Sequence, residues 1–139
     1  SNGVGGTVAE CRGADSAAEF ERQAAKTVQA VLGTAADVIV VNEIENDGYG
    51  SGSALRDLVD PLNAVAGPGT YAYVDVDAAT GQVNALGTDA IKVGIFYRPA
   101  AATPLGSPAA LNTGAFGLYT TTNGVTQRNR PALAQSFQQ

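Results

Sequence analysis

Histidine is absent from this 139-residue chain, and cysteine occurs once, at Cys11. The lack of histidine excludes Ser-His-Asp or Cys-His catalysis within the chain, and it excludes a zinc site with histidine ligands. A single cysteine forms neither an internal disulfide nor a thiolate cluster. No stretch reaches the ~18 consecutive apolar residues of a membrane span, so no membrane partner is expected.

Basic residues are also scarce. Lys and Arg together number 8 against 13 Asp and Glu, which gives a formal net charge of −5. This balance argues against a protein whose whole surface binds phosphate backbones through charge. It remains compatible with an acidic site in which a divalent metal ion contacts phosphate. The length fits one domain, and residues 1–10 are expected to be a disordered or tag-derived end.

The pattern along the chain predicts a mixed α/β (α+β) architecture, with helix, strand and helix followed by several strands. Apolar spacing predicts a helix that starts with a Ser16–Glu19 capping box and ends at Gly33. A second helix is expected over 55–65, with a kink or a break at Pro61 because proline lacks a backbone N–H.

Strand patterns follow the same chain order. The valines and isoleucine of 38–41 predict a strand that is buried on both faces. Two runs, 71–76 and 91–98, are expected to pair as an antiparallel hairpin. Further strands are predicted at 103–106 and 132–137, and the Thr/Asn/Gly-rich stretch 111–129 is predicted to be a loop.

Carboxylates begin two residues after strand 38–41, at Glu43, and continue with Glu45 and Asp47. Ligands of covered sheets bind beyond the carboxyl ends of the strands, and a carboxylate there can hold Mg²⁺ or Mn²⁺ through oxygen. The same spacing is typical of solvated loop charges, and spacing alone favours that second interpretation.

Other motifs are less informative. The glycine-rich loop 48–52 lacks both the dinucleotide and the P-loop fingerprints, and Asp75–Asp77 lacks the glycine and glutamate of a calcium loop. Arg98 and Arg130 each precede a proline at a strand boundary. Each arginine is suited either to bind phosphate through its planar guanidinium or to pair with one of the many carboxylates.

Four blocks of sequence, in this order, resemble the endonuclease/exonuclease/phosphatase superfamily, and within it the bacterial secreted extracellular nucleases. The resemblance covers about residues 11 to 138. Its blocks are Arg12–Asp15 with Glu19–Gln23, Ala36–Gly48, Gly87–Pro99 and Asn129–Phe137.

The resemblance implies a four-layer α/β/β/α sandwich in which two helices pack on a mostly antiparallel sheet. It also implies hydrolysis of phosphate esters with Mg²⁺ or Mn²⁺, or alternatively Ca²⁺, and nucleic acid as the substrate of a secreted enzyme. Glu43 matches the family's catalytic metal ligand. Arg130 matches an arginine that approaches substrate phosphate, and Asp89 matches an acidic residue that supports substrate binding.

The family site also requires an early Asn, further His, Asp and Asn residues, and a final Asp-His pair, which this sequence lacks. Residues 11–139 therefore resemble the N-terminal half of the catalytic domain, with most metal ligands outside the chain. We expect the isolated chain to be inactive and to bind the missing half or a second copy of itself. The alternatives are a non-catalytic binding or assembly module and a phosphatase of the same superfamily.

Overall fold

The computed structural model describes residues 14, 16–112, 118–120, 122–124 and 126–139. The expected disordered or tag-derived end at 1–10 and the thiol of Cys11 lie outside these residues. The described elements are, in chain order, α1 (Ala17–Thr34), β1 (Val38–Glu45), α2 (Ala54–Ala66), β2 (Ala72–Tyr73), α3 (Val76–Thr80), β3 (Ile91–Tyr97), β4 (Thr103–Leu111), β5 (Leu118–Thr120), β6 (Thr126–Arg128) and β7 (Ala132–Gln138).

Helix α1 starts where the capping residue predicts. Ser16 is its N-cap, and the Ser16 hydroxyl accepts a hydrogen bond from the Glu19 N–H at 3.2 Å. The expected end at Gly33 is wrong, because the chain leaves the helix at Ala35 with φ 53°. Thr34 supports this later end, since its hydroxyl donates to the Val31 carbonyl at 2.7 Å.

Helix α2 continues through Pro61, so of the two predicted alternatives, a kink or a break, the break is wrong. Its start is fixed by Ser53, whose hydroxyl accepts from the Arg56 N–H. Its apolar face buries Leu55, Val59 and Leu62 completely or nearly so. No helix in the described part of the chain is long and apolar enough to cross a membrane.

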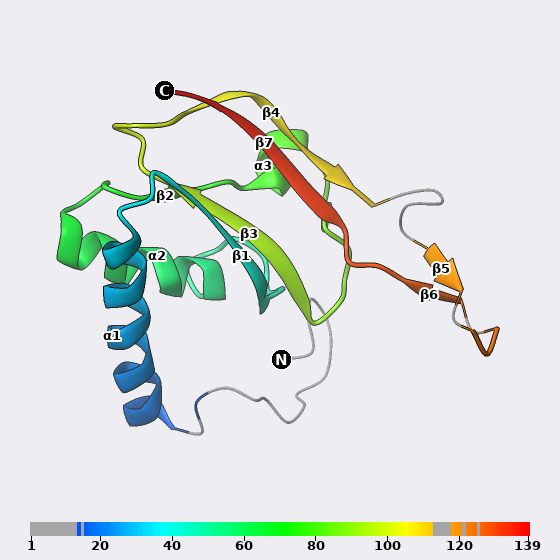
Figure 1. Ribbon diagram of the computed structural model, residues 1–139, viewed down its shortest axis with the longest axis horizontal. Coiled ribbons are helices and arrows are strands. Elements are labelled where there is room, and N and C mark those ends of the chain that lie inside the picture. The colour runs from blue at the N-terminus through cyan, green and yellow to red at the C-terminus, as the bar shows by residue number, and fades with distance from the viewer. Residues whose placement is uncertain (1–13, 15, 113–117, 121, 125) are drawn as a thin grey trace.

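The central sheet has the strand order β1-β3-β2, and both pairings are antiparallel (Figure 1). The predicted hairpin pairing is confirmed, with Ala72 opposite Tyr97 and Tyr73 opposite Phe96. The predicted strand 71–76 is too long. Asp75 instead caps helix α3, because its carboxylate accepts from the Ala78 N–H at 2.9 Å.

Two further antiparallel pairs complete the described structure, namely β4 with β7 and β5 with β6. Strand 132–137 is confirmed, whereas the strand expected at 103–106 extends to Leu111. The prediction of a loop over 111–129 is wrong where β5 and β6 lie. Threonine is frequent in this stretch, and its branched side chain favours extended backbone as well as turns.

The core lies on both faces of β3. On one face, α1 and α2 pack against the sheet around Phe96, Leu55 and Leu62, each of them 0% exposed. On the other face, Val93 packs with residues of α3, β4 and β7, and the rings of Tyr97 and Phe137 lie 5.1 Å apart. This confirms a fold of helices on antiparallel sheets, and the four-layer sandwich stays a prediction.

Gly94 of β3 permits the close packing of α2 on the sheet. A Cβ atom at this position would lie 3.1 Å from both the Leu55 side chain and the Val41 side chain. These distances are shorter than ordinary van der Waals contacts, so a larger residue would push the helix away from the sheet. The glycine therefore lets α2 approach the central strand closely.

Strand β1 is not buried on both faces, contrary to the sequence prediction. Ile39 and Val41 pack on the helix side, but Val38 and Val40 are 36% and 61% exposed. Strand β1 lies at one edge of its sheet, and β7 packs over β3 rather than over β1 (Figure 1). The apolar run at 38–41 therefore forms a strand with one covered face and one exposed face.

Replacing Leu62 by Ala should lower the free energy of unfolding by about 2–5 kcal/mol, since a buried leucine leaves a cavity. Val65→Ala is the matched control, because Val65 lies on the same helix and is 60% exposed. Its effect should stay within about 0.5 kcal/mol. Chemical denaturation measures both, and equal losses for the two variants would contradict the placement of α2.

Candidate functional site

The guanidinium of Arg130 contacts two carboxylates that lie far from it in the sequence. Its Nη1 atom is 3.6 Å from Glu43 Oε1, and its Nε atom donates to Asp89 Oδ2 at 3.1 Å. The side chains of Arg130, Glu43 and Asp89 are 46%, 70% and 54% exposed, so the group is open to solvent. We call these three residues the Arg130 cluster. They are the three that the family resemblance indicated.

Glu43 lies in a β-bulge and not beyond the end of the strand as the sequence predicts. The β1–β3 register shifts between Val41 and Ile44, and the strand continues to Glu45. Glu43 has φ 60°, a left-handed conformation that costs a residue other than glycine about 1–2 kcal/mol. Bulges turn a side chain away from the regular alternation of a strand. The carboxylate that reaches Arg130 thus comes from a strained position.

Asn46 positions Asp89, a function that the sequence did not reveal. Asn46 is 4% exposed, and its side-chain amide donates to the carbonyl oxygens of Gly87 and Asp89, both at 3.0 Å. Its backbone N–H donates to Ala90 at 2.9 Å. Asp89 Oδ1 accepts from the Ala90 N–H, which directs Oδ2 toward Arg130. The resemblance block 36–48 includes Asn46, but it assigned this residue no role.

Lys92 supports the same region from inside the protein. It is 2% exposed, and it pairs in register with Ile44, the residue after Glu43. Its Nζ atom donates to the Gly48 carbonyl at 2.6 Å and lies 3.8 Å from the centre of the Tyr49 ring. Burial lowers the pKa of Lys92, and nearby carboxylates, of which Asp47 is the strongest, oppose this shift. This amine stabilises the loop and is too deeply buried to bind a ligand.

Tyr49 completes this internal support. Burial is the main cause that raises its pKa, and the negative charges of Asp77 and Asp75 add to the effect. The phenol therefore stays neutral at physiological pH. The Tyr73 hydroxyl donates to the Tyr49 carbonyl at 2.9 Å, so the glycine-rich loop 48–52 is fixed at its beginning. These contacts give this loop a packing role.

A cleft of about 720 Å³ opens beside the Arg130 cluster. Asp89 and Arg130 line it together with asparagine side chains and a few apolar residues. We call it the Asn cleft. Its lining residues are Val83, Asn84, Leu86, Gly87, Thr88, Asp89, Asn112, Asn129, Arg130 and Pro131.

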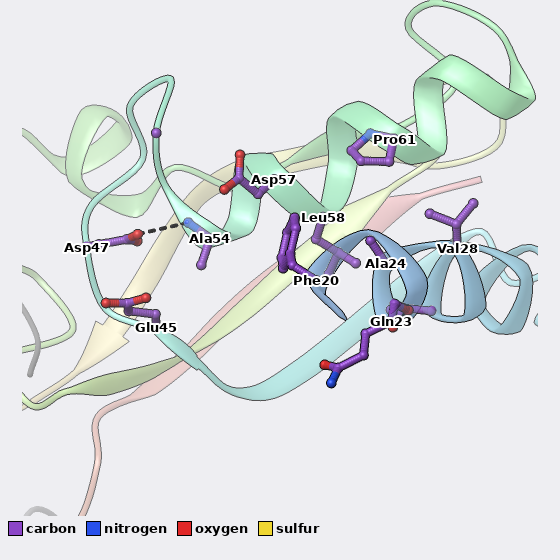
Figure 2. A pocket seen from close by; sticks show the side chains of 12 residues that line it. Phe20, Gln23, Ala24, Val28, Glu45, Asp47, Ala54, Asp57, Leu58 and Pro61 are labelled. Carbon is purple, nitrogen blue, oxygen red and sulfur yellow. Dashed lines mark hydrogen bonds between the residues drawn. The ribbon is translucent and has the colours of Figure 1, made fainter. Parts of the chain in front are cut away.

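The other carboxylates of the predicted strand-end group lie elsewhere. Glu45 and Asp47 line a hollow of about 310 Å³ between α1 and α2, where Figure 2 shows Phe20 beside Leu58. Asp47 Oδ2 accepts from the Ala54 N–H at 2.9 Å, at the start of α2 (Figure 2). The structure therefore separates Glu43 from Glu45 and Asp47, and the sequence grouping of these acids does not make one site.

Arg98, the second candidate for phosphate binding, has a structural role. Its Nη1 atom donates to Asp37 Oδ1 at 3.0 Å, and its N–H donates to the Asp37 carbonyl at 2.8 Å. These bonds join the end of β3 to the start of β1. Of the two alternatives left open by the sequence, pairing with a carboxylate is the one that the structure shows for Arg98.

The Arg130 cluster has the chemistry of a hard-cation site. Two carboxylates face one guanidinium, so the cluster carries a formal excess of one negative charge. Mg²⁺ and Mn²⁺ prefer such oxygen ligands, and Mg²⁺ typically uses one or two carboxylates plus water and substrate phosphate. Among the described residues, no three His, Cys, Asp or Glu side chains gather as a metal cage. Two carboxylates make at most part of a metal site, so a metal ion at the Arg130 cluster stays a prediction.

In comparisons with known proteins, no family model, no curated protein and no solved structure matches the chain. The assignment to the endonuclease/exonuclease/phosphatase superfamily therefore stays a prediction from the four sequence blocks. The Arg130 cluster supplies independent geometry with which that prediction can be tested.

The left-handed backbone of Glu43 leads to a prediction about stability. Glu43→Gly should be more stable than Glu43→Ala by about 1 kcal/mol, because only glycine adopts this conformation without a Cβ penalty. Thermal or chemical denaturation of the two variants measures the difference.

Glu21, an exposed residue of α1, is the control position for this comparison. There the order should reverse, with the glycine variant less stable than the alanine variant by about 1 kcal/mol. The same order at both positions would show that the bulge at Glu43 does not impose strain.

Proposed function

We propose that this chain is part of a secreted, metal-dependent nuclease that hydrolyses phosphodiester bonds of nucleic acid. The observation that carries the proposal is the convergence of Glu43, Asp89 and Arg130. These residues come from a strand bulge, the loop before β3 and the segment before β7. Side chains brought together from three segments, one of them strained, are typical of functional sites.

In this proposal Arg130 binds the phosphate of the substrate. A guanidinium has five N–H donors; Arg130 directs the one on Nε at Asp89, and its Nη1 atom lies 3.6 Å from Glu43 Oε1. The remaining donors match the paired oxygens of a phosphate group. Asp89 holds the guanidinium in place, and Asn46 holds the backbone of Asp89.

Glu43 is the proposed metal ligand of this chain, and Asp89 is the second carboxylate within reach of Arg130. A divalent ion bound there supplies charge neutralisation at the phosphate and lowers the pKa of bound water. The two carboxylates would supply negative charge around that ion. The positive charge of Arg130 would offset the repulsion between the two carboxylates. This combination explains how an acidic chain can act on a polyanion.

The proposal assigns the remaining ligands to residues outside this chain. A second half of the domain would also find an apolar surface on β1, where Val38 and Val40 are exposed. We therefore expect the chain alone to be inactive, and a longer form extended at both ends to be active.

Cleavage of plasmid DNA and of a single-stranded RNA in the presence of Mg²⁺ or Mn²⁺ tests the proposal. In the longer form, Glu43→Gln should lower the cleavage rate at least about 100-fold, because it replaces the negatively charged carboxylate of the proposed metal ligand by a neutral amide. Glu21→Gln is the matched control on α1, and it should leave the rate unchanged.

Three results would contradict the proposal. The first is a longer form that cleaves neither the DNA nor the RNA. An unchanged rate for Glu43→Gln is the second. The third is cleavage of phosphomonoesters alone, which would indicate a phosphatase.

A further inference from the structure

We propose that the Asn cleft binds the nucleobase of the nucleotide whose phosphate lies at Arg130. This inference rests on the proposed function, because it uses the phosphate position that Arg130 defines. Asp89 and Arg130 line both the Arg130 cluster and the cleft, so one nucleotide can contact the two regions at once. The volume of about 720 Å³ falls in the range of small-molecule sites.

The floor of the cleft is held rigidly. Gly87 has φ 78°, and a Cβ atom there would lie 3.5 Å from Pro131 and 3.7 Å from the Asn112 amide nitrogen. The Gly87 N–H donates to the Asn84 carbonyl at 2.7 Å, which closes a tight turn. The close approach of these segments brings the loop before β3 against the segment before β7.

Asp77 fixes the wall that carries Asn84. Its two carboxylate oxygens accept from the N–H groups of Asn84 at 3.0 Å and of Ala85 at 2.9 Å. Asn112 is fixed as well, since its amide donates to the Ala85 carbonyl at 3.3 Å. Two of the three asparagines in the lining, Asn84 and Asn112, are thus held by hydrogen bonds before a ligand binds, and such preorganisation lowers the entropic cost of binding.

The lining matches a nucleobase better than a second phosphate. Arg130 is the only cation in it and Asp89 the only anion, so the rest of the described lining is neutral. Amide side chains hydrogen bond to the donor and acceptor edges of bases. Leu86 and Pro131 are buried and present only a small part of their apolar surface to the cleft, whereas Val83, which is 87% exposed, can contact the face of a base.

This inference can be tested by titrating the chain with deoxyadenosine 5′-monophosphate and, separately, with 2-deoxyribose 5-phosphate. Nuclear magnetic resonance monitors both titrations. The two probes share the sugar and the phosphate, and in the second a hydroxyl group replaces the base. The nucleotide should bind at least about tenfold more tightly, which corresponds to one or two hydrogen bonds made to the base. Its shift changes should include Asn84, Gly87 and Asn112. Equal affinity for the two probes would overturn the inference.

Asn84→Gly removes the amide and suits the backbone, because Asn84 has φ 56°. It should bring the affinity for the nucleotide to within about threefold of that for the base-free probe. Gln29→Ala on the exposed surface of α1 is the control and should keep the tenfold preference. If Asn84→Gly does not fold, the comparison of the two probes on the unchanged chain still decides.

The same titration on Glu43→Gln separates this inference from the proposed function. The preference for the base should survive in that variant, because Glu43 belongs to the Arg130 cluster and not to the base contacts. A retained preference without any cleavage by the longer form would overturn the nuclease and keep the base site. Cleavage that depends on Glu43, together with equal binding of the two probes, would support the nuclease and overturn the base site.

Discussion

The antiparallel pairing of β1 with β3 is the interaction on which the rest of the structure depends. It carries the helices on one face and the contact with β7 on the other. The bulge within it turns Glu43 out of the regular alternation, and the Asn46 amide at its end holds the loop of Asp89. Two carboxylates therefore meet one arginine because a single strand pair sets the position of both. Lys92, buried on β3, adds a charged anchor to the same pair.

Much of this fold could be predicted from local patterns. The capping serine, the apolar face of α2 and the alternation in β3 each depend on neighbouring residues, and each is confirmed. Burial on β1 could not be predicted, because a run of branched residues looks the same whether one face or both are covered. The extra length of β4 and the strands within 111–129 depend on partners far along the chain, which local propensity does not encode.

The candidate site shows the same division. The resemblance indicated Glu43, Asp89 and Arg130, and the structure brings them together. Sequence spacing grouped Glu43 with Glu45 and Asp47, and this grouping failed because the bulge separates Glu43 from the two acids at the α1–α2 hollow. Asn84 and Asn112 lie in no motif, and Asn46 lies in the resemblance block 36–48 without an assigned role. Their importance follows only from the carbonyl groups and the cleft that the fold places beside them.

The central claim is that the Arg130 cluster is where this chain holds a metal ion next to phosphate. Titration with Mn²⁺ tests it most directly, because this paramagnetic ion broadens the resonances of nearby nuclei even when it binds weakly. The account predicts broadening that starts at Glu43, Asp89 and Arg130 and that disappears in Glu43→Gln. Broadening centred on Glu45, Asp47 and Asp57, or broadening at the Arg130 cluster that persists in Glu43→Gln, would contradict it.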